Sequence, residues 1–315
     1  MSSNGYSSGL GVRAQGERHR VLRRISQLVY HVPGTRLCCR WLVRRLIQGT
    51  DLPVKQKQRL FNFFALETAP GRDLHTTMRT PFGTIRAILD LSDDLSRLWH
   101  YWGYFDYEPG VTRLLYKLLP DKTCVFDVGA NIGYYTLLMA LALRGRGEVH
   151  AFEPAPIVSS ALERNASLND LRNLVMNPCA LADRDGRMDL FLPADGAWTN
   201  ASLIEHFTPQ SQRIAVQAMR FDSYCRREAI DHADLVKLDV EGAELSVLRG
   251  MGELLLKWRP DIICEVLEPF ANELEGFFAA TPYRKFLITD ERLEPASRLD
   301  ANPRYRDYFL TCSSS

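Results

Sequence analysis

The segment from Thr123 to Thr136 constrains the fold of this chain more than any other stretch. It begins with a short, β-prone apolar run, Cys124 to Val128, which is too short for a helix and is typical of a buried strand. Gly129, Gly133 and then a helical pattern of apolar residues follow. Glycine allows a tight turn, and a helix start offers free N–H groups and a positive dipole end. The order of strand, turn and helix predicts the first half of a βαβ nucleotide-binding unit, with an ordinary strand-to-helix loop as the alternative.

Three polar residues indicate which ligand this unit would bind. Asp127 ends the first strand, and Glu153 ends the next one, which we expect over Glu148 to Pro154. Asn131 stands where a dinucleotide fold carries the glycine that lets a pyrophosphate approach the backbone. A carboxylate at the mouth repels phosphate and suits an ammonium group, while an acid after the second strand can accept hydrogen bonds from ribose hydroxyls. An ammonium group, an adenosine and no phosphate together predict S-adenosylmethionine.

Three motifs in order make the sequence recognisable. They are Asp127-Val-Gly-Ala-Asn-Ile-Gly-Tyr-Tyr-Thr, Ala151-Phe-Glu-Pro-Ala-Pro and Val236-Lys-Leu-Asp-Val-Glu-Gly-Ala-Glu. In order and spacing they resemble the FkbM family of class I methyltransferases over roughly Thr80 to Ile288. The resemblance implies an α/β, doubly wound, Rossmann-like sheet of seven strands. It also implies O-methylation of a hydroxyl on a small molecule, either a sugar or glycan or a natural-product metabolite.

The predicted cofactor site lies at the carboxyl ends of the strands, where ligands collect in doubly wound sheets. The third strand is expected over Asn173 to Leu181, which brings the adenine ring near Ala180. The resemblance adds Glu108, which follows Tyr107 in an aromatic-Glu pair, at the methionine end of the cofactor. The full set of predicted cofactor-binding residues is Glu108, Asp127, Gly129, Asn131, Gly133, Tyr135, Glu153, Ala180 and Asp239.

The catalytic candidates are Asp239, Glu241 and His206. Methyl transfer is a direct displacement, so the protein supplies alignment and, for a hydroxyl acceptor, a base. Asp239 lies at the mouth of the fourth core strand, Asp234 to Val240, and Glu241 lies in the turn after it. His206 lies in a long polar loop, residues 193–214. The alternatives are a turn-stabilising acid for Glu241 and a solvated loop residue for His206.

The residues after the fourth strand narrow the acceptor and raise the question of a metal. Enzymes that methylate exocyclic base amines carry Asn/Asp-Pro-Pro-aromatic there, whereas this chain has Asp239-Val-Glu-Gly, which favours a hydroxyl acceptor. Asp239 and Glu265 end adjacent strands and could hold Mg²⁺. Mg²⁺ prefers six oxygen ligands, so two carboxylates alone are weak evidence for a Mg²⁺ site. We therefore assign no metal ligands.

Two other classes of protein compete with a methyltransferase. A nicotinamide-dependent oxidoreductase uses a similar sheet, but Asn131 in place of the second glycine counts against it. A non-catalytic module that binds the cofactor or docks on membranes is the other alternative. Intact Asp127, Glu153 and Asp239 count against loss of the catalytic site.

The chain divides into three predicted parts. Residues 1–17 are rich in Ser and Gly and are expected to be a disordered tail, residues 18–78 a helical extension, and residues 79–315 the methyltransferase domain. Arg18 to Gln48 predicts two amphipathic helices with arginines on the polar face. This basic pair could lie weakly on anionic lipid, or it could form a cap packed on the catalytic domain, which we favour.

Further patterns concern the start of the catalytic domain. Met78 to Leu91 alternates around Pro81-Phe82-Gly83, which predicts a hairpin. Leu95 to Tyr107 is dense in aromatic residues, which favours core packing over a substrate-binding wall.

Charge and cysteine content indicate the compartment and the partners. Residues 1–50 carry nine arginines and one acid, a net charge of +8, and the remainder carries 30 basic and 37 acidic residues, a net charge of −7. The mildly acidic body argues against a nucleic-acid partner. Seven scattered cysteines without a Cys-x-x-Cys pair indicate a reducing compartment. The absence of a signal-peptide pattern and of an 18-residue apolar run adds to the expectation of a cytoplasmic protein. These patterns leave the oligomeric state open.

Overall fold

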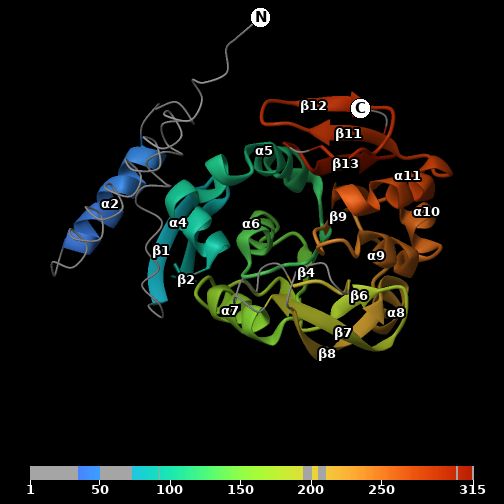
Figure 1. Ribbon diagram of the computed structural model, residues 1–315, viewed down its shortest axis with the longest axis horizontal. Helices are drawn as coiled ribbons and strands as arrows, with labels where there is room; N and C mark the ends of the chain where they lie inside the picture. The colour runs from blue at the N-terminus through green and yellow to red at the C-terminus, as the bar shows by residue number, and fades with distance from the viewer. Residues whose placement is uncertain are drawn as a thin grey trace, which may run out of the picture.

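An eight-stranded sheet lies at the centre of the computed structural model (Figure 1), with the strand order β12-β11-β13-β10-β9-β3-β4-β5. The structure describes residues 35–49, 73–91, 93–193, 201–204, 211–302 and 304–313. The strands of the sheet are β3 (Cys124–Val128), β4 (Glu148–Phe152), β5 (Leu174–Asn177), β9 (Leu235–Leu238), β10 (Asp261–Glu265), β11 (Arg284–Ile288), β12 (Leu293–Ala296) and β13 (Asp307–Thr311). A sheet of seven strands was predicted, and β12 is an additional edge strand that pairs with β11.

The direction of the strands places a crevice in the middle of the sheet. β3, β4, β5, β9 and β10 are parallel, whereas β13 runs antiparallel to both β10 and β11. From β3 the chain proceeds to β4 and β5 on one side and then to β9 and β10 on the other. The strand order therefore reverses between β3 and β9. Ligands of doubly wound folds bind at such a reversal, outside the carboxyl ends of the strands.

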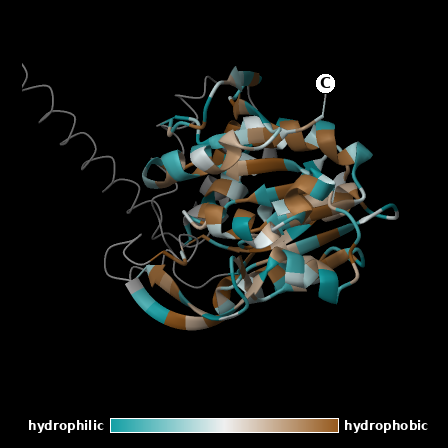
Figure 2. Ribbon diagram, turned by 90° about the vertical axis from the view of Figure 1, so that its right-hand side faces the viewer, coloured by the Kyte–Doolittle hydropathy of each residue, from teal (hydrophilic) through white to brown (hydrophobic). Residues whose placement is uncertain are grey.

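Helices cover both faces of the sheet because the central strands are apolar on both sides. Val125 of β3 packs into one core cluster, and its neighbour Phe126 packs into the other. In Figure 2, brown apolar segments run through the interior and teal hydrophilic segments gather toward the periphery. The first face carries α5 (Pro109–Leu118), α6 (Tyr134–Ala142) and α7 (Pro156–Ser167), and the second carries α8 (Phe221–Arg227), α9 (Glu244–Met251), α10 (Leu254–Trp258) and α11 (Ala271–Ala279). Two short 3-10 helices, η1 (Leu119–Asp121) and η3 (Glu268–Phe270), precede β3 and α11.

The prediction of one long third strand over Asn173 to Leu181 is wrong. The chain forms β5, breaks, and continues as β6 (Ala180–Ala182) in a separate three-stranded sheet of order β6-β8-β7. Pro178 lies in the break, and a proline has no N–H with which to continue the ladder of hydrogen bonds. The other strands of the small sheet are β7 (Gly186–Pro193) and β8 (Ser211–Arg220). β8 begins inside the predicted loop 193–214, which is therefore shorter than expected.

The predicted helical extension 18–78 is wrong at its carboxyl end. β1 (Asp73–Thr80) already belongs to a hairpin with β2 (Gly83–Asp90), which confirms the hairpin and moves its start from Met78 to Asp73. Thr76 and Met78 of β1 are buried, so the alternation of buried and exposed residues begins before the predicted start at Met78. The tail 1–17 and the first basic helix lie outside the described residues.

The second basic helix packs on the catalytic domain. α2 (Thr35–Gln48) contacts α4 (Asp94–Tyr107), with Val43 and Ile47 buried against Tyr101 and Trp102. Trp99, Tyr101 and Trp102 are all buried, so these three members of the predicted aromatic-dense stretch are core residues. Within the described residues no helix is long and apolar enough to cross a membrane. Weak contact of residues 18–48 with lipid stays a prediction, which sedimentation with anionic liposomes tests.

Candidate active site

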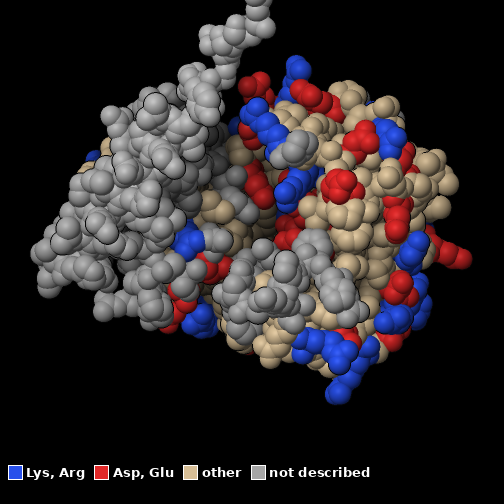
Figure 3. Space-filling view, in the orientation of Figure 1, with Lys and Arg blue, Asp and Glu red and all other residues tan. Residues whose placement is uncertain are grey.

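A pocket of about 470 Å³ opens at the carboxyl ends of β3 and β9, where the strand order reverses. Figure 3 shows acidic and basic side chains gathered around a hollow on this face of the molecule. One side, which we name the β3–β4 wall, carries Asp127, Gly129, Asn131 and Glu153. The other side, which we name the β9–β13 wall, carries Asp239, Glu241, Glu265 and Asp307.

Asp127 is the most deeply buried acid of the β3–β4 wall, with 1% of its surface exposed. Its Oδ2 accepts a hydrogen bond of 2.5 Å from the hydroxyl of Thr136 on α6. Its Oδ1 is buried and has no hydrogen-bond partner among the described residues. Burial raises the pKa of Asp127, and nearby Lys237 partly opposes that rise. A buried oxygen without a partner is rare in folded proteins, so this atom can accept a hydrogen bond from a ligand at little cost.

Gly129 brings the turn after β3 against the end of β9. Its φ of +84° is a left-handed conformation, and a Cβ at this position would overlap the carbonyl oxygen of Asp239. Gly133, with φ of +98°, precedes the first residue of α6 and does not line the pocket. Gly129 therefore lines the pocket, whereas Gly133 shapes the start of the helix, and cofactor binding by either glycine stays a prediction.

Backbone groups fix Glu153 and Asn131 in place. The N–H of Asn131 donates to Glu153 Oε2 (3.0 Å), and the N–H of Ala155 donates to Oε1 (2.9 Å). The Asn131 side chain folds back so that its Oδ1 accepts from the N–H of Ile132 (2.8 Å). The backbone N–H of Asn131, which a phosphate could use, is thus occupied by Glu153. Burial raises the pKa of Glu153 to about 7, and its oxygens keep further lone pairs for hydroxyl donors.

Ala180 also lines the pocket, as predicted, although it belongs to β6 of the small sheet. Its neighbours Cys179 and Leu181 line the pocket with it. Three small or apolar side chains at this end suit a flat, apolar group such as a heterocyclic base.

Lys237 on β9 joins the two walls and was not predicted. It is 3% exposed, and its Nζ donates to Asp239 Oδ2 (2.8 Å) and lies 5.1 Å from the centre of the Tyr135 ring. Tyr135 in turn donates its hydroxyl hydrogen to Glu108 Oε2 (2.7 Å). Burial alone would lower the pKa of Lys237, but Asp239, Asp127 and Glu108 outweigh it and raise that pKa. A lysine inside an otherwise apolar strand was the sequence signal for this role.

The β9–β13 wall concentrates carboxyl groups that repel one another. Glu241, with φ of +53°, has its pKa raised to about 8 by burial and by Asp239 and Glu244. Burial and neighbouring acids raise the pKa of Glu265 to about 10, and its Oε2 has no hydrogen-bond partner in the described part of the chain. Asp307 pairs with Glu265 across β13 and β10, and burial together with Glu108 and Asp239 raises its pKa well above the usual range.

Asp307 was missed because it begins its strand. The predicted site residues lie at the carboxyl ends of parallel strands, but β13 is antiparallel, so its first residue lies at the same edge as the last residue of β10. The direction of this last strand was the signal that could have identified Asp307.

The long polar loop reaches the pocket in its described part. The hydroxyl of Ser202 donates to the carbonyl oxygen of Glu241 (2.7 Å), and Ala201 and Leu203 line the pocket. His206 lies outside the described residues. Asp239 and Glu241, the other two catalytic candidates, both line the pocket.

The fold and the site together define a class I methyltransferase. The sheet carries an antiparallel β13 inserted between β10 and β11, and a glycine turn at the strand reversal is flanked by acids after β3 and β4. A family model described as a methyltransferase FkbM domain matches residues 127–288, just over half of the chain. The chain belongs to the FkbM methyltransferase family.

The chain is also similar to several named relatives and to solved structures. The chain is 28% identical to methyltransferase sdnD of Sordaria araneosa, over 48% of this chain and 69% of the relative. It is 29% identical to 2-O-methyltransferase NoeI of Sinorhizobium fredii, over 47% of this chain and 66% of the relative. It is 30% identical to 31-O-demethyl-FK506 methyltransferase FkbM of Streptomyces tacrolimicus, over 40% of this chain and 58% of the relative. A crystal structure of methyltransferase FkbM from Methylobacillus flagellatus is 17% identical, covers 70% of this chain and 55% of that one, and has a TM-score of 0.41.

Proposed function

We propose that this protein transfers a methyl group from S-adenosylmethionine to a hydroxyl group of a sugar, a glycan or a natural-product metabolite. The observation that carries the proposal is the buried Oδ1 of Asp127 in the pocket at the strand reversal, an atom with no hydrogen-bond partner among the described residues. A carboxylate oxygen in that position suits a cationic ammonium group and opposes a phosphate. The relative 2-O-methyltransferase NoeI supports an oxygen acceptor, and the relative hexuronic acid methyltransferase AglP of Haloferax volcanii supports a sugar.

The residues of the β3–β4 wall fit the parts of this cofactor. Asp127 would bind the ammonium group, and Glu153, held by two backbone N–H groups, would accept hydrogen bonds from the ribose hydroxyls. Ala180 and its apolar neighbours would hold the adenine ring. Glu108 and Tyr135 would border the methionine end. Gly129 lets the turn after β3 pack against Asp239, because a Cβ would overlap the Asp239 carbonyl oxygen.

The β9–β13 wall would serve the acceptor. S-adenosylmethionine supplies a methyl group that its positively charged sulfur already activates. Lys237 holds Asp239 at the mouth of β9, so that Asp239 can orient the acceptor hydroxyl. Glu241, in its carboxylate form, can accept the hydroxyl proton at one of its Oε atoms. Burial strengthens it as a base by raising its pKa to about 8.

Two measurements test the proposal at its two levels. Calorimetry with S-adenosylhomocysteine tests cofactor use, and binding of NADH in its place would refute it. A labelled-methyl screen against glycans and hydroxylated metabolites, with the product bond identified by mass spectrometry, tests the acceptor. Methylation at nitrogen or carbon would leave cofactor use intact and overturn the hydroxyl assignment.

We also propose that the reaction takes place in the cytoplasm. Cys124, Cys179, Cys225, Cys264 and Cys312 are free, and three of them, Cys124, Cys225 and Cys264, are buried. Free thiols suit a reducing compartment.

A further inference from the structure

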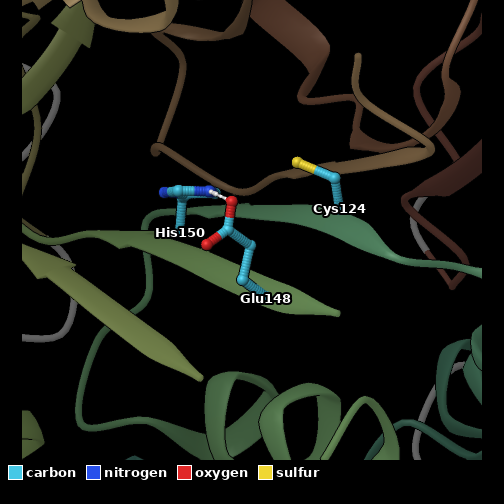
Figure 4. Close-up of side chains that lie close together, drawn as sticks. All are labelled: Cys124, Glu148 and His150. Carbon is cyan, nitrogen blue, oxygen red and sulfur yellow. Dashed lines mark ion pairs between the residues drawn. The ribbon is translucent and has the colours of Figure 1, made fainter. Parts of the chain in front are cut away.

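Three residues that the catalytic site does not use come together at the opposite, amino end of the central strands. Cys124 is the first residue of β3 and pairs with Glu148, the first residue of β4. His150 follows Glu148 by two residues, so both side chains lie on one face of the sheet. Figure 4 shows the sulfur of Cys124 turned toward the side chains of Glu148 and His150. In the part of the chain that the structure describes, this is the one group of three or more ligand-type residues close enough to share an ion.

The spacing of the three groups matches that of ligands around one metal ion. One ligand atom from each residue lies within 4.8 Å of the other two. His150 Nε2 and Glu148 Oε1 are 3.2 Å apart. Two ligand atoms on a tetrahedral zinc ion with bonds of 2.0–2.1 Å are about 3.3 Å apart. The nitrogen and the oxygen are thus already at ligand spacing, and the sulfur has to approach by an ångström or so at most.

The surroundings of His150 favour a metal ligand. The side chain is 3% exposed, and its Nδ1 lies 2.8 Å from the hydroxyl of Tyr224, which also accepts a hydrogen bond from Asn177 Nδ2 (3.2 Å). With the ring hydrogen on Nδ1, the Nε2 lone pair faces Glu148. Nε2 is buried and, despite its nearness to Glu148 Oε1, makes no hydrogen bond of acceptable geometry with any described residue. A metal-ligating imidazole is usually held in this way, with its other ring nitrogen bound to a fixed partner.

The charges around the group are negative. Glu148, Asp234 and Asp231 act on Cys124, and Glu148 and Glu228 act on His150. A metal ion that binds would displace the proton of the Cys124 thiol. Glu148 is 51% exposed, which gives an ion access from solvent.

We propose that Cys124, Glu148 and His150 bind a divalent transition-metal ion, zinc by the nature of the donors, with water as the fourth ligand. A thiolate, an imidazole and a carboxylate form a zinc ligand set. The ion would join the first residues of β3 and β4, the strands whose other ends carry Asp127 and Glu153. The site is separate from the pocket, so its existence does not depend on the proposed methyl transfer.

Metal counting and cobalt substitution test the site. The full chain is stripped with a chelator, equilibrated with Zn²⁺, and the bound zinc is counted for the wild type, Cys124→Ser and Glu148→Gln. We expect the wild type to bind one more zinc ion per chain than either variant. With Co²⁺, the wild type should show a thiolate-to-cobalt charge-transfer band that Cys124→Ser lacks. Tyr224→Phe, which keeps the ring and removes the hydroxyl, should weaken zinc binding about 10–100-fold.

A matched control makes the test decisive. Cys225 is a second buried cysteine in the same core cluster and is not part of the group, so Cys225→Ser should keep both the extra zinc and the cobalt band. Glu148→Gln changes a half-exposed side chain, so circular dichroism should show a native fold and its zinc loss can be read directly. Equal zinc in the wild type and Glu148→Gln would overturn the site, as would a missing cobalt–thiolate band or an equal loss in Cys225→Ser.

Discussion

On the β3–β4 wall the carboxylates of Asp127 and Glu153 are held by neutral donors, namely the Thr136 hydroxyl and the backbone N–H groups of Asn131 and Ala155. On the β9–β13 wall, by contrast, the acids face other charges: Asp239 pairs with Lys237, and Arg306 lies 3.7 Å from Glu265. Neutral hydrogen bonds fix a geometry without a partner charge. Clustered carboxyl groups instead raise one another's pKa values and respond to any proton or cation that arrives.

This difference predicts that the two walls have different functions. Changes in the β3–β4 wall should alter cofactor affinity, and changes in the β9–β13 wall should alter turnover and its pH dependence. Substitutions in each wall test this difference in function.

Asp239→Asn should abolish detectable turnover or lower kcat on the order of 10²–10³-fold, because it removes the charge that Lys237 orients at the mouth of β9. The fold should survive, since Asp239 is partly exposed and its backbone contacts stay. Turnover with any accepted substrate and circular dichroism provide the two readings. Near-normal turnover would move the catalytic site elsewhere.

Asp127→Asn should weaken binding of S-adenosylhomocysteine by about 1.5–3 kcal/mol, as expected for loss of a charge-assisted hydrogen bond. Calorimetry measures this change directly. Asp121→Asn, an exposed acid in η1, is the control and should bind like the wild type. Equal affinity in all three proteins would remove Asp127 from the ammonium site.

Glu241→Gln should lower kcat more than it alters cofactor affinity, and it should change the pH dependence of stability. The pKa of Glu241 rises from 4.5 to about 8 in the folded protein. Between those values the unfolded chain binds fewer protons than the folded one, so stability falls as pH rises. The melting temperature of the wild type should therefore fall more steeply than that of Glu241→Gln from about pH 5 to about pH 9. If the melting temperatures of the two proteins changed with pH in parallel across this range, the pKa of Glu241 would not be raised in the folded protein.

The smallest effect is expected away from both walls. Arg44 of α2 donates to the Thr76 hydroxyl (2.8 Å) and to the Thr77 carbonyl (2.7 Å), so Arg44→Ala should lower stability by about 1 kcal/mol. Thermal melting measures the loss, and Arg45→Ala, at an exposed position of the same helix, is the matched control. Neither variant should change kcat. A change in kcat would mean that the cap contributes to the site.

The sequence predicted the β3–β4 wall well because its residues lie in short, local motifs. The glycine turn and the acids at the ends of two strands can be read in a single pass along the chain. Lys237 and Asp307 depend instead on which strands become neighbours, and neighbours far apart in the chain leave no local pattern. β12 was not predicted because this four-residue edge strand contains Pro295, and proline is unfavourable in strands. The break at Pro178 places β6 in a second sheet.

The position of β13 has a consequence for the order of folding. Along the chain, β13 follows every other strand of the sheet, yet in space it lies between β10 and β11. The hairpin of β11 and β12 joins the sheet through β13, so it has no edge to dock on until β13 has formed. During synthesis from the amino end, the β3–β4 wall can therefore assemble first. Asp307 arrives with β13. A nascent chain would thus acquire its ligand-holding half before its reactive half, and catalytic competence would appear only when the sheet is complete.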